Sequence, residues 1–102
     1  MKNIQIMTQN QILEILKSLK NEVRKLYKVE LKGIFGSYAR GKERKESDID
    51  ILVEFCQGAT LLDLSGLGNF LEEKLQHKVD VVSQRAVREE IKSYIYKDMI
   101  YL

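Results

Sequence analysis

The chain has 102 residues, of which 44% are hydrophobic and 31% charged, and its formal net charge at pH 7 is +2. This length is typical of one compact domain over residues 1–102, and so small a net charge provides no broad basic field for nucleic acid or an anionic membrane. No apolar run approaches the roughly 20 residues that cross a membrane, no apolar signal segment begins the chain, and the single cysteine, Cys56, cannot form an internal disulfide. We therefore expect a cytoplasmic protein with no membrane attachment and no direct nucleic-acid binding.

The first third of the chain predicts an amphipathic helix over about residues 9–27, followed by a strand. Thr8 begins a pattern typical of a capping box, in which Gln11 reaches back to the helix start. Behind it, apolar residues recur at alternating steps of four and three, which indicates one buried helix face: Ile12, Leu16, Leu19, Val23 and Leu26. Val29–Phe35 is then expected to form the first strand and to end at a turn.

The middle of the chain joins that turn to the clearest strand. Residues 36–41 read Gly-Ser-Tyr-Ala-Arg-Gly, and a charged run at 42–46 follows. This run mixes both signs of charge without aromatic residues, which favours a solvated loop over an RNA-binding patch. The second strand is expected at Asp48–Phe55, with a continuous apolar face at its odd-numbered positions: Ile49, Ile51, Val53 and Phe55.

The second half begins with another expected helix. Thr60 is suited to cap it, and the following leucines predict its buried stripe: Leu61, Leu64, Leu67, Leu71 and Leu75. Gly66 and Gly68 weaken such a helix by roughly 1 kcal/mol each relative to alanine, so we expect a kink or close packing there.

A third strand, Lys78–Ser83, carries Asp80, and Ser83 is expected to cap a third helix. One face of that helix would hold four residues: Val87, Ile91, Tyr94 and Ile95. Residues 98–102 fit either a helix or a short strand. The order of elements predicts an α/β fold of the α+β type, in which a small mixed sheet packs with about three helices.

Asp48 and Asp50 are the first candidate site residues. Alternate residues on a strand share one face, so these two carboxylates can share a ligand. Two adjacent carboxylates beside a triphosphate suit a pair of hard divalent cations such as Mg2+ or Mn2+. Asp80 is the natural third carboxylate, because the valines around it form a strand that could lie beside the first pair; the alternative is a surface position on an edge strand.

The Gly36-Ser37 turn is the second part of the candidate site. Glycine allows the backbone to approach phosphate oxygens, and exposed amides with a hydroxyl can donate to them, unless Ser37 is only a turn residue. Arg40 could touch the β or γ phosphate, or form a structural ion pair, while Lys42, Arg44 and Lys45 could widen the positive rim. We expect His77 to be a surface residue and Cys56 to be a packing residue.

These motifs resemble the signature of the DNA polymerase β-like nucleotidyltransferase superfamily, and most closely its smallest branch, the minimal nucleotidyltransferases. That branch's pattern of Gly-Ser-x-Ala-Arg-Gly, five residues and then Ser-Asp-x-Asp is met residue for residue at Gly36 to Asp50. The Val-Asp-Val-Val at 79–82 and the tail Ile100-Tyr101-Leu102 are also similar. The resemblance covers the chain from about Gly33 onward.

The resemblance implies an enzyme that acts with a protein partner. Members of this branch transfer AMP from ATP to a tyrosine of a HEPN-domain RNase toxin and so act as its antitoxin, which implies a hetero-oligomer. By this interpretation Gly36, Ser37 and Arg40 hold ATP. Asp48 and Asp50 bind both metal ions, and Asp80 binds the catalytic ion and helps to deprotonate the acceptor.

Two other functions remain open from the sequence. The first is an antitoxin that neutralises its partner by occlusion alone. The second is a nucleotidyltransferase acting on a small molecule, although 102 residues leave no room for the acceptor-binding domain that larger relatives carry.

Overall fold

The computed structural model describes residues 8–42 and 47–102. In chain order these form α1 (Gln9–Tyr27), β1 (Val29–Phe35), the one-turn helix α2 (Gly36–Ala39), β2 (Ile49–Phe55), α3 (Leu61–Leu75), β3 (Val79–Ser83), a 3-10 turn (Gln84–Ala86), α4 (Glu89–Lys97) and β4 (Ile100–Tyr101). The strands make one sheet in the order β3-β2-β1-β4. β2 and β3 are parallel and the other neighbours antiparallel, which confirms the predicted small mixed sheet.

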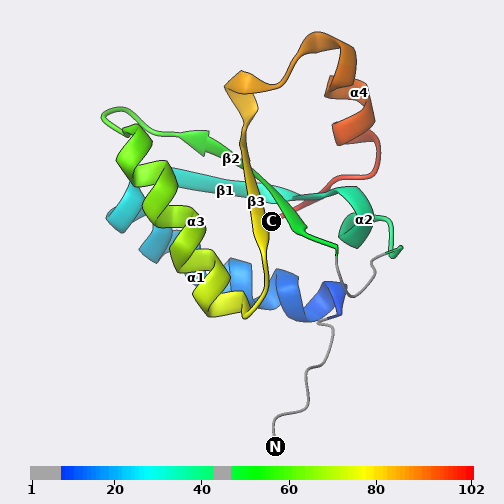
Figure 1. The fold of residues 1–102 in the computed structure, drawn as a ribbon, viewed down its shortest axis with the longest axis horizontal. Coiled ribbons are helices and arrows are strands. Elements are labelled where there is room, and N and C mark those ends of the chain that lie inside the picture. Colours follow the sequence, from blue (N-terminus) through cyan, green and yellow to red (C-terminus); the bar gives the residue numbers. More distant parts are fainter. Residues whose placement is uncertain (1–7, 43–46) are drawn as a thin grey trace, which may run out of the picture.

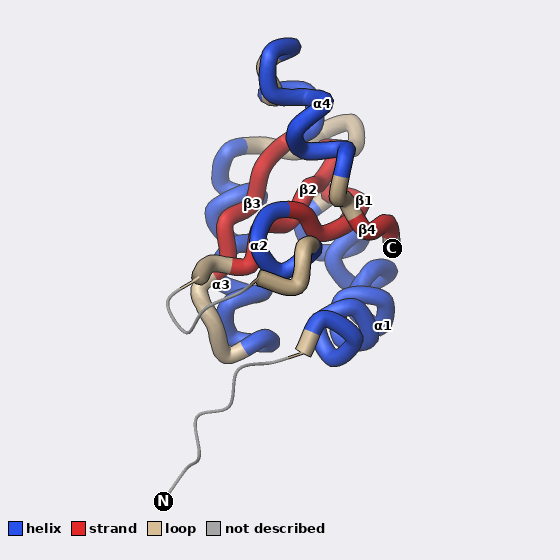
Figure 2. Tube along the Cα trace, turned by 90° about the vertical axis from the view of Figure 1, so that its right-hand side faces the viewer, coloured by secondary structure: helices blue, strands red, loops and turns tan. Residues whose placement is uncertain are grey.

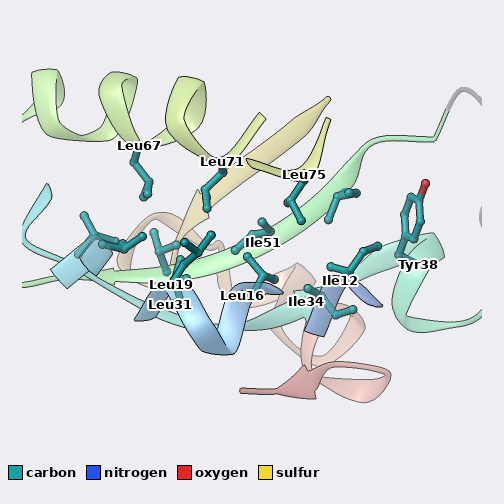
Figure 3. Packing of buried hydrophobic residues seen from close by; sticks show 14 residues of the cluster. Ile12, Leu16, Leu19, Leu31, Ile34, Tyr38, Ile51, Leu67, Leu71 and Leu75 are labelled. Carbon is teal, nitrogen blue, oxygen red and sulfur yellow. The ribbon is translucent and has the colours of Figure 1, made fainter. Parts of the chain in front are cut away.

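Two helices cover one face of this sheet. Figure 1 shows α1 and α3 on the same side of the strands, and Figure 2, turned by 90°, shows α4 on the opposite side. Side chains from α1, α3 and the strands interdigitate between these layers (Figure 3). This main core supplies most of the buried apolar residues, so the covered face is the one that holds the fold together.

Helix α1 has the predicted bounds and the predicted cap. The Thr8 side chain accepts a hydrogen bond from the Gln11 amide, and the Gln11 side chain accepts one from the Thr8 amide. The predicted stripe is buried except for Leu26, which is 54% exposed. The expectation for Leu26 was wrong because Tyr27 packs against Phe70 of α3 instead, with ring centroids 5.4 Å apart.

Helix α3 is also capped as predicted, by Thr60 together with Asp63. Its last three leucines, Leu67, Leu71 and Leu75, are buried. The predicted stripe was wrong at its start, since Leu61 is 83% exposed and the first turn lies at the end of the molecule farthest from α2 (Figure 1). The expected close packing is found at one glycine, Gly66, where an added Cβ would press on the Tyr27 ring, whereas the space beside Gly68 is open.

The C-terminal region differs most from expectation. Helix α4 begins at Glu89, and Ser83 makes no side-chain cap. Ile91 and Tyr94 are 46% and 62% exposed, so the predicted buried face was wrong at these two positions. The buried residues of this region, Val87, Ile95 and Met99, pack with Phe35 of β1 and Leu52 of β2 as a small cluster on the second face of the sheet. The ambiguous tail forms β4, which pairs with β1.

Candidate active site

The alternation of side chains along β2 separates the aspartates from the main core. Ile49, Ile51 and Val53 are buried among the residues of the covered face. Asp50 therefore projects from the opposite face, and Asp48, two residues earlier and exposed, precedes the strand on the same side. In the parallel pairing of β2 with β3, Asp50 lies directly beside Asp80. The fold thus brings together the three aspartates that the sequence singled out.

Asp50 has an unusual electrostatic environment. Partial burial raises its pKa, and the nearby Asp80 and Asp48 carboxylates raise it further, while the Arg40 guanidinium lowers it; the resulting pKa is about 6. Repulsion between like charges is the condition that a bound cation relieves. A cation bound beside these carboxylates on this face of the sheet would therefore be stabilised by them.

The Gly36 turn packs directly on the Asp50 carboxylate. Gly36 has a φ of 76°, in the left-handed region that disfavours other residues. A Cβ at this position would also collide with a carboxylate oxygen of Asp50. Glycine is thus required both by the backbone conformation and by the close approach of the turn to the aspartate.

Gly36–Ala39 form the one-turn helix α2, where the sequence predicted a turn without helical structure. The Arg40 amide donates to the Gly36 carbonyl at 3.1 Å, and the Lys42 amide donates to the Ser37 carbonyl at 2.9 Å. From α1, the Gln9 side chain donates to the carbonyls of Tyr38 and Ala39, each at 3.0 Å. Ser37 is half-buried in this turn, and these hydrogen bonds hold the turn whose first residue, Gly36, packs on Asp50.

Arg40 is exposed and contacts α4. Its Nη1 lies 3.4 Å from the Tyr94 hydroxyl, and its guanidinium carbon lies 5.7 Å from the centroid of the Tyr94 ring. Arg40 also lies close enough to Asp50 to lower the pKa of that carboxyl. Within the described ranges, the salt bridges are Lys32–Glu54 and Lys92–Glu89. Arg40 therefore lies near the site, and it forms no salt bridge with any residue in the described ranges 8–42 and 47–102.

The three aspartates fit a metal site by their chemistry and placement. Carboxylate oxygens are the ligands that Mg2+ prefers. Over residues 8–42 and 47–102, no three acidic, histidine or cysteine side chains are already gathered as a metal centre. A cation would therefore have to draw the carboxylates inward, and the proximity of Asp48, Asp50 and Asp80 allows this.

The structure also places Cys56 and the first of the basic residues that follow Gly41. Cys56 is half-buried just after β2, and its amide donates to the Lys28 carbonyl at 2.9 Å. Lys42 is exposed, whereas Arg44 and Lys45 lie outside the described residues. No helix in the described part of the chain is long and apolar enough to cross a membrane.

His77 was missed as a site-associated residue. It lies between α3 and β3, and it is half-buried rather than at the surface because its ring packs edge-on against the Tyr38 ring, with centroids 5.7 Å apart. Its Nε2 is 3.2 Å from the Tyr38 hydroxyl. No sequence pattern pairs a histidine after one helix with a tyrosine 39 positions earlier, so only the fold reveals this contact.

Comparison with known families covers the candidate site and most of the rest of the chain. A family model described as a nucleotidyltransferase domain matches residues 16–102. A protein of Methanocaldococcus jannaschii, provisionally named a protein adenylyltransferase, is 40% identical over 96 residues, covering 93% of this chain and 98% of the relative. Protein adenylyltransferase MntA of Thermococcus cleftensis is 34% identical over 97 residues, covering 95% of this chain and 98% of the relative.

Solved structures agree with these sequence matches. A structure provisionally described as a minimal nucleotidyltransferase superposes with a TM-score of 0.80 at 30% identity, covering 97% of this chain and all of the other, 100%. A chain from a crystal structure of the toxin–antitoxin MntA–HpeT, in a Y104A mutant, gives a TM-score of 0.64 at 25% identity, covering 95% of this chain and 72% of the other.

Proposed function

The chain belongs to the nucleotidyltransferase domain family, and from this premise we propose that it transfers AMP from ATP to a partner protein as the antitoxin of a toxin–antitoxin pair. The observation that carries the proposal is the meeting of Asp50 with Asp80 and with the Gly36 turn on the less covered face of the sheet. Nucleotidyl transfer needs this combination, because carboxylates must hold cations where a turn holds the phosphates.

The aspartates would hold the metal ions. Asp48 and Asp50 would each bind both of two divalent cations, Mg2+ or Mn2+, and Asp80 would complete the site of the catalytic one. When bound, the cations would stabilise negative charge on the attacking and leaving oxygens. The raised pKa of Asp50 supports this role, because it reflects the same crowding of negative charge.

The turn and its neighbour would hold the nucleotide. The backbone and hydroxyl of Ser37, together with the backbone at Gly36, would donate to the phosphate oxygens of ATP. Arg40 would reach the β or γ phosphate, which requires it to leave or share its contact with Tyr94. ATP thus becomes the AMP donor, with its α-phosphorus next to the aspartates.

The transfer itself is a substitution at that phosphorus. The acceptor hydroxyl oxygen forms a bond to the α-phosphorus, and the bond from this phosphorus to the bridging oxygen breaks, which releases pyrophosphate. The acceptor proton passes to the exposed carboxylate of Asp80 and then to solvent. No oxidant or further reactant is needed.

The proposed acceptor is a tyrosine hydroxyl on a HEPN-domain toxin that forms a hetero-oligomer with this chain. Three observations support a protein acceptor: relatives of nearly the same length are named protein adenylyltransferases, a structural neighbour comes from a toxin–antitoxin complex, and both Asp48 and Asp80 are exposed. An open site of this kind can receive a side chain presented by a second protein.

The test is transfer of label from α-labelled ATP, with Mg2+, to the product of the neighbouring gene, which the proposal expects to be a HEPN-domain protein. We expect labelled toxin with the wild type and none with the Asp48→Ala/Asp50→Ala double variant. Glu54→Gln is the matched control: Glu54 lies on the same strand and face, with its carboxylate 3.8 Å from Lys32, so transfer should persist. Transfer that survives the double substitution would overturn the proposal.

Two further readouts, protection against the toxin and label on a free hydroxyl compound, separate the two alternatives. An antitoxin that acts by occlusion alone would protect against the toxin equally well as the double variant and would leave no label. A small-molecule nucleotidyltransferase would label a free hydroxyl compound and not the toxin.

A further inference from the structure

A single imidazole is linked to all three segments that carry the candidate site. The Nε2 of His77 lies 3.2 Å from the Tyr38 hydroxyl, and its Nδ1 lies 3.0 Å from the Lys78 carbonyl oxygen. The same carbonyl accepts the Ile49 amide at 3.0 Å. These contacts place His77 between α2, the start of β2 and the start of β3.

The chemistry of these partners fixes the tautomer of His77. A carbonyl oxygen only accepts hydrogen bonds, so Nδ1 must carry the proton that it donates to Lys78. In the neutral ring Nε2 is then an acceptor, and the Tyr38 hydroxyl donates to it. The ring therefore has a defined orientation, set by one partner on each side.

Each partner lies within two residues of a group assigned to the site. Tyr38 directly follows Ser37 in the phosphate-binding turn. Ile49, the first residue of β2, lies between Asp48 and Asp50, and Lys78 precedes Asp80 by two residues. A shift of the imidazole would therefore be transmitted to the turn and to both strands through short stretches of backbone.

Tyr38 makes this link stiff. Its side chain is 0% exposed, and Figure 3 shows its ring at one end of the main core, with the hydroxyl projecting from the packed layers. Burial fixes the ring within the main core. Movement of the Tyr38 ring away from His77 would therefore disturb the packing of that core.

On these contacts we propose that His77, acting through Tyr38, is a positioning residue that sets the phosphate-binding turn against the aspartates. The proposal rests on the proposed nucleotidyl transfer but goes beyond the family motif, in which Tyr38 occupies the variable position of Gly-Ser-x-Ala-Arg-Gly and His77 does not take part. Neither residue contacts the substrate in this role. Both act by holding Ser37 and Asp80 in place.

The kinetic test uses substitutions that remove one link at a time. Tyr38→Phe keeps the buried ring and removes its hydroxyl, and His77→Asn keeps a donor for the Lys78 carbonyl but cannot reach Tyr38. We expect each to lower kcat roughly 10- to 100-fold, because misplacement of reacting groups has effects of this size, and to raise KM for ATP, because the turn that binds its phosphates is displaced. The double variant should be no worse than either single variant, since both break one link.

Two further variants keep the result interpretable. His77→Gln restores an acceptor near the position of Nε2 and should recover part of the lost kcat. Tyr27→Phe is the matched control, because Tyr27 is a half-buried tyrosine whose ring packs against Phe70 of α3, at the far end of α1 from the site. The proposal is overturned if Tyr38→Phe lowers kcat no more than Tyr27→Phe does, or if the two site substitutions are simply additive.

Amide hydrogen exchange tests the positioning without any activity. In Tyr38→Phe and His77→Asn we expect faster exchange at the Arg40 and Lys42 amides, which are bonded within the turn, and unchanged exchange at the Lys28 amide, which is bonded to Arg24. If the wild type transfers no AMP, the proposed function fails while this measurement still decides the positioning role. Unchanged exchange at the turn would overturn that role alone.

Discussion

On β2, Ile51 points toward α1 and α3, whereas its neighbours Asp50 and Leu52 point to the opposite face of the sheet. The first face meets two long helices and a continuous apolar core. The second meets the short helix α4, the one-turn helix α2, a small apolar cluster and the aspartates. Successive residues of a strand point to opposite faces of the sheet. The residues that stabilise the fold and those that would perform the chemistry are therefore direct neighbours along β2. Substitutions of adjacent residues should therefore have quite different effects.

The largest expected effect on stability lies on the covered face. Ile51→Ala removes a side chain that is 0% exposed, and it should lower the free energy of unfolding by about 2–5 kcal/mol in urea denaturation. Leu52→Ala, one residue on and equally buried, should cost less because its small cluster lies on the face with less cover and can relax more easily. A greater loss for Leu52→Ala would reverse this ranking of the two faces.

An intermediate effect is expected at Gly36. Gly36→Ala forces a side chain into a left-handed backbone conformation and against the Asp50 carboxylate, and it should cost about 1–3 kcal/mol of stability. Transfer should be lost as well, because the turn must move off the aspartate. Gly41→Ala is the matched control, since Gly41 has a similar φ of 69° but open space around it. Equal loss of transfer in both variants would show that strain, not the contact with Asp50, is responsible.

The smallest expected effect is the titration of Asp50. Its pKa in the folded protein is about 6, above the ordinary value of 3.8. The folded state therefore binds more protons than the unfolded state between these values, and the contribution of Asp50 to stability is lost as pH rises through about 6. Asp50→Asn should thus raise Tm slightly at pH 7.

The direct measurement is the carboxyl carbon chemical shift of Asp50 as a function of pH. Without metal the midpoint should lie near 6, and Mg2+ should lower it because a bound cation competes with the proton. A midpoint near 4 without metal would mean that the aspartates are not crowded on this face. An unchanged midpoint with Mg2+ would place the cation elsewhere.

The parts that the sequence predicted are those in which local pattern and tertiary packing agree. The bounds of α1, the caps at Thr8 and Thr60, and the alternation on β2 all follow from short-range preferences. The proximity of Asp80 to Asp50 was predicted because a run of valines around an aspartate is typical of a strand beside the sheet. Their roles in catalysis and ATP binding remain predictions.

The parts that failed depend on what a segment meets in space. Leu61 and Tyr94 carry the same helical spacing as buried residues, yet the fold leaves both largely exposed. The helical form of residues 36–39 and the contact between His77 and Tyr38 likewise depend on residues far apart in the chain. Periodicity identifies the apolar face of a helix, but it does not say how much of that face another element covers.

The position of β3 in the sheet has a consequence for how activity would be lost on heating. β3 is an edge strand, bonded on one side to β2, and none of its five residues is fully buried. Local opening of an edge segment with little burial costs less free energy than unfolding of the whole chain. When β3 separates from β2, Asp80 would move away from Asp50 while β1 and β2 stayed paired. On heating, activity should therefore be lost before the rest of the fold melts. A bound nucleotide with its cation would stabilise the attachment of β3 to β2 and so raise the temperature of inactivation.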